Sequence, residues 1–62
     1  MEEIEIFIKG HKAPFRFKGE YLGHTRPDGK VTRNWHYYRD ENGEVYHFRK
    51  TEIQLVISKE IG

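Results

Sequence analysis

The 62-residue sequence contains no cysteine. This absence excludes disulfide bonds and every zinc or iron–sulfur centre that uses cysteine ligands. Because extracellular chains this short usually depend on disulfides, we expect a reducing, cytoplasmic location. No apolar run approaches the roughly 20 residues of a membrane helix, and the acidic start Met1-Glu2-Glu3 is unlike a secretory signal. We therefore expect no membrane association.

Motifs of catalysis and cofactor binding are also missing. The only serine is Ser58, and there is no glycine-rich phosphate loop or His-x-His pair. His36 and His47 could bind zinc together with Glu20, or act with Arg49 and Tyr38 in a metal-free nuclease. Both schemes require groups held close together, and a shallow sheet face desolvates them poorly. We expect no metal, no cofactor and no enzymatic activity.

The net charge is only +1, but the charges are unevenly distributed. Between Lys9 and Lys50, ten Lys or Arg residues stand against five acids, and all four histidines lie there. The two ends of the chain carry the remaining acids. A basic central segment is typical of either a solvated surface or a surface that binds an anionic partner.

The chain is long enough for one small domain, residues 1–62, which would bury roughly 60% of its unfolded surface. Strict alternation predicts a strand over residues 3–9, followed by a loop that ends at Pro14. Three further runs, residues 15–25, 31–39 and 44–49, predict an antiparallel meander. We then expect a 3₁₀ turn over 50–52, a last strand over 53–58, and a frayed tail over 59–62.

The turns between these strands determine which side chains share a face. Pro27-Asp28-Gly29 predicts a three-residue loop, which places Tyr21 opposite Trp35. For the second hairpin we favour a two-residue Asn42-Gly43 turn, with a four-residue loop over 40–43 as the alternative. Both alternatives place Trp35 on the same face as Tyr46, and a three-residue loop would not.

With these turns, one face of the sheet gathers the large apolar side chains. We predict that this face forms the core. Its members are Ile4, Ile6, Ile8, Phe17, Tyr21, Val31, Trp35, Tyr37, Tyr46, Phe48, Ile53, Leu55 and Ile57.

The predicted order of strand, loop, meander, 3₁₀ turn and strand resembles the SH3-like barrels. The resemblance is carried by Phe-Lys-Gly-Glu-Tyr-Leu-Gly at 17–23, by residues 37–46, and by the turn that leads to Ile53. It implies an all-β, small five-stranded SH3-like barrel with a central three-stranded antiparallel meander. The loop over residues 10–14 is short for many such domains, and an OB-like barrel is the alternative fold.

The opposite face of the predicted meander combines cations with rings. Cations neutralise phosphates and rings stack on unpaired bases, so this face suggests a nucleic-acid-binding module. The predicted nucleic-acid-binding residues are Arg16, Lys18, His36, Tyr38, His47 and Arg49, with Arg26 and Arg33 from the neighbouring loop.

The alternative function is protein–protein interaction, as a small regulator or inhibitor of a larger protein. Such a module would use an exposed sheet edge or a patch of Leu22, Tyr38 and Val45. Under either hypothesis the chain would be a monomer or a homodimer paired through sheet edges.

Overall fold

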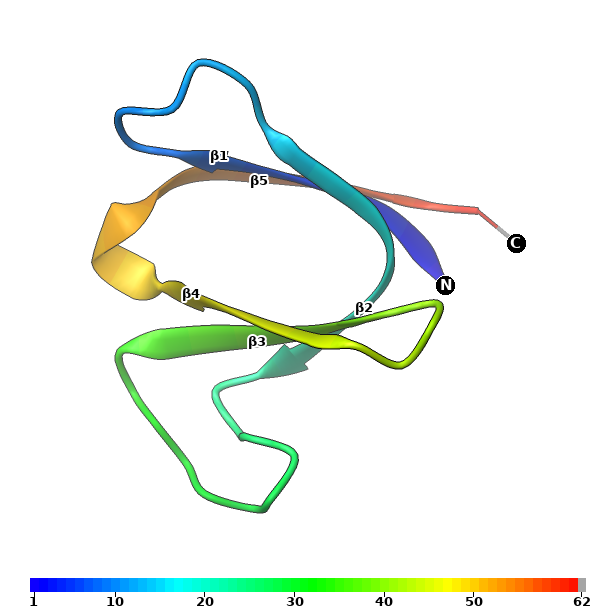
Figure 1. Cartoon of the computed structure of the whole chain (residues 1–62), viewed down its shortest axis with the longest axis vertical. Coiled ribbons are helices and arrows are strands. Elements are labelled where there is room, and N and C mark those ends of the chain that lie inside the picture. Colours follow the sequence, from blue (N-terminus) through cyan, green and yellow to red (C-terminus); the bar gives the residue numbers. More distant parts are fainter. Residues whose placement is uncertain (62) are drawn as a thin grey trace.

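A computed structural model describes residues 1–61, which form five antiparallel strands and one 3₁₀ turn (Figure 1). The strands are β1 (Glu2–Ile8), β2 (Phe15–Gly23), β3 (Trp35–Asp40), β4 (Val45–Arg49) and β5 (Ile53–Glu60), and the turn η1 spans Lys50–Glu52. The predicted all-β class, the meander and the 3₁₀ turn are confirmed. Helical structure in the described chain is limited to η1, so none of it could cross a membrane as a helix.

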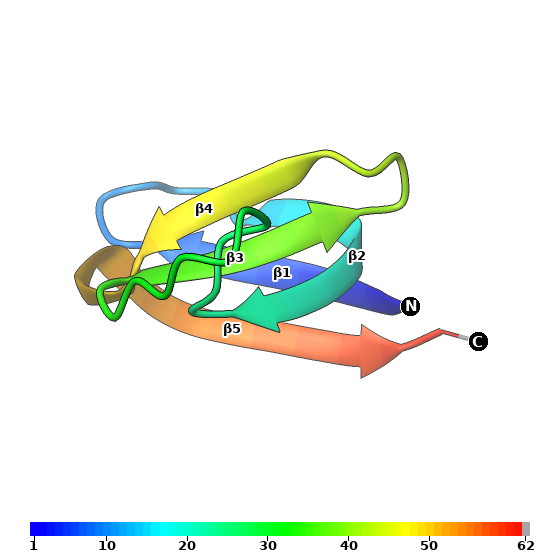
Figure 2. The ribbon, with the colours of Figure 1, turned by 90° about the horizontal axis from the view of Figure 1, so that it is seen from below.

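The five strands form a single sheet in the order β4-β3-β2-β1-β5. Figure 1 shows β2 curving from the pair β1 and β5 to the pair β3 and β4, and Figure 2 shows β4 and β5 at opposite edges. No ladder joins β4 to β5 in the described residues, so the predicted closure into a barrel is not observed. The three-residue turn η1 carries the chain from one edge of the sheet to the other without pairing them.

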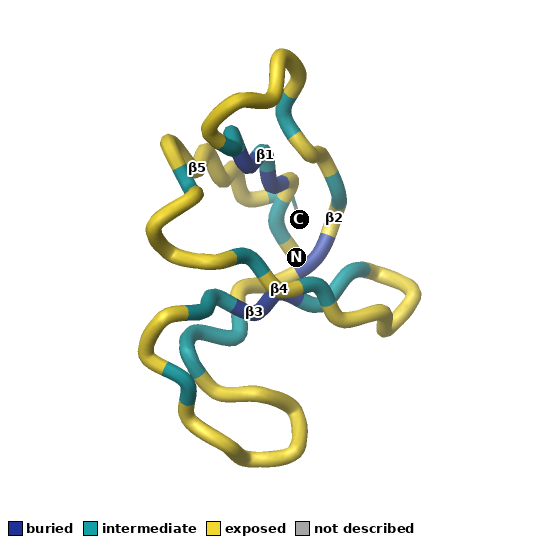
Figure 3. The backbone as a smooth tube through the Cα atoms, turned by 60° about the vertical axis from the view of Figure 1, so that its left-hand side comes forward, coloured by how far each residue is buried: buried dark blue, intermediate teal, exposed yellow. Residues whose placement is uncertain are grey.

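The core lies on the inner face of this bent sheet, the face that carries Ile4 and Ile6 of β1. These two side chains are 1% and 0% exposed, and Tyr38 of β3 is 4% exposed beside them (Figure 3). Successive side chains of a strand point to opposite faces, so the alternation of β1 sends both isoleucines inward. The half-buried residues packed against this cluster are Ile8, Phe17, Phe48 and Ile53.

The second hairpin corrects our prediction. It has the three-residue loop 41–43, in which the amide of Asp40 donates to the carbonyl of Glu44 at 2.9 Å and Gly43 has a positive φ of 84°. The Asp40 carboxylate accepts from the amides of Asn42 and Glu44, both at 2.9 Å. These two bonds stabilise the longer loop over a two-residue Asn-Gly turn.

Compared with our prediction, the three-residue loop reverses which residues of β3 share a face with Tyr46 and Phe48 of β4. Tyr38 now pairs with Tyr46, and Trp35 pairs with Arg49. Trp35 and Tyr37 therefore lie on the outer face of the sheet, where Trp35 is partly exposed and Tyr37 is buried, with 7% of its surface exposed. The prediction that they are inner-face residues is wrong, and so is the placing of Tyr38 outside.

The first hairpin confirms our prediction at its tip only. The amide of Arg26 donates to the carbonyl of Lys30, Gly29 has a positive φ of 93°, and Thr25 pairs with Val31. The register then shifts, so that Tyr21 opposes Tyr38 and not Trp35. Residues 32–34 form a turn instead of continuing the strand, which leaves Val31 70% exposed outside the core.

Strand β5 is longer than we predicted, and part of it turns the opposite set of side chains toward the core. Its ladder with β1 extends to Glu60, so Lys59 and Glu60 are not a frayed tail; Gly62 lies outside the described residues. A register shift between Phe7 and Ile8 leaves Ile53 facing the core but turns Leu55 and Ile57 outward. A β-bulge changes the side-chain alternation in this way. Leu55 and Ile57 are 51% and 46% exposed, so their predicted inner position is wrong.

Candidate nucleic-acid interface

Four side chains form a cluster on the outer face of β3 and β4: Trp35, Tyr37, His47 and Arg49. Trp35 pairs directly with Arg49 across the two strands, and Tyr37 pairs with His47. Directly opposed side chains of antiparallel strands lie side by side, so the register alone brings the four together. We call these four residues the outer aromatic surface.

The rings and the guanidinium of this surface are in contact. The Trp35 and His47 ring centroids are 5.0 Å apart with the planes at 70°, an edge-to-face arrangement. The Cζ of Arg49 lies 5.2 Å from the centroid of the Trp35 ring, within the range of a cation–π interaction. Tyr37 lies behind His47, at 6.2 Å between ring centroids. Because Tyr37 is buried and His47 is exposed, the accessible rings are those of Trp35 and His47.

Hydrogen bonds hold this surface from the loop between β2 and β3. Thr32 Oγ1 donates to the Tyr37 hydroxyl at 2.9 Å, and His24 Nδ1 lies 2.9 Å from the carbonyl oxygen of Trp35. The amide of Lys50 donates to the carbonyl of Asn34 at 2.8 Å, which links the end of β4 to the start of β3. Rings held in this way lose less conformational freedom when a ligand binds.

Ion pairing distinguishes Arg49 and the loop residue Arg33 from the other three arginines. Arg16 lies 3.3 Å from Glu5, Arg39 lies 3.5 Å from Glu20, and Arg26 lies 3.3 Å from Asp28. Arg49 has no carboxylate partner within residues 1–61 and is exposed. Its guanidinium donors are thus available for a phosphate while its Cζ lies over the Trp35 ring.

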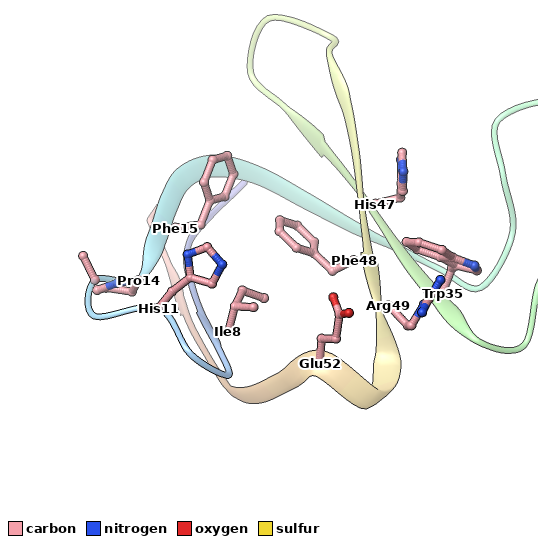
Figure 4. A pocket seen from close by; sticks show the side chains of 10 residues that line it. Ile8, His11, Pro14, Phe15, Trp35, His47, Phe48, Arg49 and Glu52 are labelled. Carbon is pink, nitrogen blue, oxygen red and sulfur yellow. The ribbon is translucent and has the colours of Figure 1, made fainter.

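Two depressions adjoin the outer aromatic surface. One, of about 340 Å³, is lined by Arg26 and Thr32 together with Trp35, Tyr37 and His47. The other, of about 380 Å³, is lined by Trp35, His47 and Arg49, and Figure 4 shows Phe48, Phe15 and Glu52 on the other side of β4 from these three. Trp35 and His47 line both depressions, so they stand between them.

Of the predicted nucleic-acid-binding residues, the structure brings His47, Arg49 and Arg26 to this surface. Arg33 is an exposed residue of the adjacent loop. Arg16 and Lys18 are on the outer face of β2, where they line a separate depression with Glu3 and Glu41. They lie at the opposite end of β3 from Trp35, because Gly19 pairs with Asp40.

His36 and Tyr38 face the other way, toward the core. His36 Nδ1 lies 2.6 Å from the Tyr21 hydroxyl, and burial, followed by the charges of His24 and Lys50, lowers the pKa of His36. Burial also raises the pKa of Tyr38 to about 12, with further contributions from Tyr21 and Glu2. Tyr38 is therefore a core ring and not the stacking ring we predicted.

The same geometry separates the residues considered for a metal site or a nuclease. His36 lies on the inner face and His47 on the outer face, so they cannot bind one ion. Within the part of the chain that the structure describes, no three His, Asp or Glu side chains are placed to hold a metal ion.

Sequence reasoning missed Trp35 and Tyr37 as members of this surface because both were assigned to the inner face, although Tyr37 is buried as predicted. A signal for the correct assignment was present in Asp40-Glu41-Asn42-Gly43. An Asp that begins a type I turn, with Gly in the left-handed position three residues later, is typical of a three-residue hairpin loop. Reading this loop in place of Asn42-Gly43 alone would have placed both rings on the outer face.

No protein-family model, curated protein or solved structure matches this chain.

Proposed function

We propose that this chain is a non-enzymatic module that binds single-stranded nucleic acid through the outer aromatic surface. The observation that carries the proposal is the placement of Arg49 over Trp35 with no carboxylate partner within residues 1–61. An unpaired cation beside accessible rings offers a phosphate contact next to a stacking contact, the two interactions that single strands provide together.

The basic central segment of the sequence supports the same function. Lys50 follows Arg49 directly, and Arg26, Lys30 and Arg33 lie in the loop that borders Trp35 and Tyr37. Cations around a stacking site attract the backbone and make binding dependent on salt. A single strand fits better than a duplex, because only unpaired bases expose their faces to Trp35 and His47.

Trp35 itself provides the direct test, because it is the only tryptophan of the chain. A short oligothymidine should quench Trp35 fluorescence at low salt, and anisotropy of the labelled strand should give the same Kd. Stacking on an aromatic side chain contributes about 1–3 kcal/mol per base, so Trp35→Ala should weaken binding about 5- to 150-fold. Trp35→Phe should retain most of the affinity.

A matched pair of charge reversals separates a local contact from diffuse attraction. Arg49→Glu and Lys59→Glu change the net charge equally, but Lys59 lies on β5, outside the outer aromatic surface. Arg49→Glu should cause the larger loss and reduce the slope of log K against log salt. The proposal fails if no single strand binds at low salt, or if both reversals weaken binding to the same extent.

The second candidate function is association with another protein, which the exposed apolar residues of β5 favour. Leu55 and Ile57 are about half exposed on the outer face, and the outer edge of β5 has no partner strand in the described chain. An unpaired apolar edge can add a strand from a second copy of the chain. Sedimentation should then reveal a dimer that resists salt and that Leu55→Glu dissociates; a monomer at high concentration would contradict it.

For the architecture, we propose an SH3-like barrel that is open between β4 and β5. The strand order β4-β3-β2-β1-β5 and the 3₁₀ turn before the last strand support this assignment over an OB-like barrel. Inter-strand nuclear Overhauser effects between β1 and β5, and their absence between β4 and β5, would test it.

A further inference from the structure

The larger depression beside the outer aromatic surface has the features of a pocket for one base. It measures about 380 Å³ and shares Trp35, His47 and Arg49 with that surface. A single strand of nucleic acid whose phosphate backbone contacts Arg49 therefore passes the mouth of this pocket. The inference rests on the proposed function, because it concerns the base that follows the stacked one.

The walls of the pocket are apolar and ring-lined. Ile8, Phe15 and Phe48 line it together with Pro14, and Phe15 is 39% exposed (Figure 4). The rings of Phe15 and Phe48 are tilted by 58°, with centroids 5.6 Å apart, so they form a corner and not a stacked pair. A flat aromatic group can pack against such a corner and bury its faces there.

One carboxylate points into this pocket. Figure 4 shows the Glu52 side chain extending from η1 toward Phe48, and Glu52 makes no ion pair within the described residues. A carboxylate repels phosphates, so it opposes binding of a backbone at this point. Its favourable interaction with a nucleic acid is as an acceptor of hydrogen bonds from N–H groups of a base.

Guanine is the base that matches a carboxylate best. Its N1–H and its N2 amino group are adjacent donors on one edge and can fill both oxygens of Glu52. Adenine and cytosine offer one amino group beside a ring acceptor, and thymine and uracil offer one N–H between two carbonyls, so each leaves an acceptor facing the carboxylate. The imidazole of His11 lines the same pocket and can donate to guanine O6.

We propose that this pocket binds a guanine base of a single strand, with Glu52 accepting hydrogen bonds from N1–H and N2–H. The base would lie in the corner of Phe15 and Phe48, while Arg49 contacts the adjacent phosphate. Recognition would be specific at this one position and tolerant at the stacked positions beside it.

The test varies one base in a constant background. Labelled nine-nucleotide strands carry guanine, inosine, adenine, cytosine or thymine at the centre of a thymidine run, and anisotropy gives each Kd at the same salt concentration. A good bidentate pair discriminates by about 1–3 kcal/mol, so guanine should bind about 5- to 150-fold more tightly than adenine. Inosine lacks the 2-amino group but keeps N1–H, and should fall between them.

The protein side of the test uses two equivalent substitutions. Glu52→Gln leaves one acceptor where two are needed, so it should reduce the preference for guanine without weakening the all-thymidine strand. Glu41→Gln removes a charge in the loop between β3 and β4, at the far end of the sheet, and should leave the preference unchanged. Both side chains are exposed, so neither change removes a core contact.

The outcomes separate the two proposals. Equal affinity for all five strands would overturn the guanine pocket while the outer aromatic surface remained supported. A guanine preference that survives Glu52→Gln would overturn the assigned role of Glu52. Failure of every strand to bind at low salt would overturn the proposed function and the pocket with it.

Discussion

The inner and outer faces of β3 carry similar residues in different surroundings. Tyr38 on the inner face packs edge-to-face on Phe17 and Phe48, at 5.6 and 5.8 Å between ring centroids, and is 4% exposed. Trp35 on the outer face is only half-buried and lies beside a histidine and an arginine. The same class of side chain thus stabilises the fold on one face and forms the outer aromatic surface on the other. The partners of a ring, more than its type, indicate its role.

This contrast arises from four consecutive ring-bearing residues, Trp35-His36-Tyr37-Tyr38. A strand must send alternate residues to opposite faces, so His36 and Tyr38 face inward while the other pair lies on the outer face, where Tyr37 is nevertheless buried. The short loop after β3 decides which pair is which, and it does so through Asp40. The compositions of the outer aromatic surface and of the core are therefore coupled in this chain through one turn.

The two faces should differ most in how much the free energy of unfolding falls when an aliphatic side chain is shortened. Ile6→Ala removes a side chain that is 0% exposed, and should lower the free energy of unfolding by about 2–5 kcal/mol. Leu55→Ala on the outer face, where half of the side chain is already exposed, should cost about 1 kcal/mol or less. Urea denaturation followed by circular dichroism measures both.

Ile6→Ala can unfold a domain this small outright, so Ile6→Val provides a milder version. It should cost about 0.5–1.5 kcal/mol and leave a measurable transition. Equal losses from Ile6→Ala and Leu55→Ala would contradict the assignment of the two faces.

The next effect concerns two neighbouring residues of β2, Gly19 and Lys18. A Cβ on Gly19 would meet the carbonyl oxygen of Arg39 and lie 2.8 Å from the Cα of Asp40, so β2 and β3 would have to separate. Gly19→Ala should destabilise the fold by about 1–3 kcal/mol, the usual cost of overpacking. Lys18→Ala, one residue away on the outer face, should change stability by no more than about 0.5 kcal/mol. Thermal denaturation of both variants tests this, and a neutral Gly19→Ala would refute the close approach.

The sequence predicted the inner face well where the pattern was unambiguous. In β1, Ile4 and Ile6 alternate with Glu3 and Glu5, so the two isoleucines could be assigned to the core without knowing the turns. The glycine-containing tip at Pro27-Asp28-Gly29 was also predicted correctly, because its turn chemistry is local.

The outer aromatic surface could not be predicted in the same way. With rings at four successive positions, either alternation of β3 gives an apolar inner face, so the hydrophobic pattern does not select the register. The choice depends on hydrogen bonds of the Asp40 side chain and on the turn at residues 32–34, which shifts the first hairpin. His47 and Arg49 were assigned correctly because β4 alternates cleanly between aromatic and polar residues.

In alkaline solution we expect a smaller effect on the free energy of unfolding, which comes from Tyr38. The pKa of Tyr38 is raised from 10.0 to about 12, mainly by burial. Because the folded pKa exceeds the unfolded one, protonated Tyr38 contributes full stability below pH 10, and this contribution is lost as pH rises from 10 toward 12. Denaturation midpoints at pH 9 and pH 11 should differ less in Tyr38→Phe than in the parent chain. The difference should not vanish, because the pKa of Tyr46 is also raised to about 12.

The smallest effect on the free energy of unfolding that we expect comes from Asp40, at the loop between β3 and β4. Burial favours protonation of Asp40, but hydrogen bonds from the Tyr46 hydroxyl and the amides of Glu44, Asn42 and Gly43 outweigh it and lower the pKa of the carboxyl below 3.8. A lowered folded pKa gives stability that is present above pH 3.8 and lost as pH falls below it.

Tyr46→Phe removes one of these hydrogen bonds and keeps the ring on the inner face. It should therefore reduce the acid-dependent part of the stability slightly, with little change in the unfolding midpoint at neutral pH. Asp40→Asn should reduce it further, because it removes the titrating group itself. If Asp40→Asn also exposes or buries Trp35, as its fluorescence maximum would report, the turn sets the register of β3. An unchanged Trp35 spectrum would mean that the packing of Tyr38 against Phe17 and Phe48 holds the register without the turn.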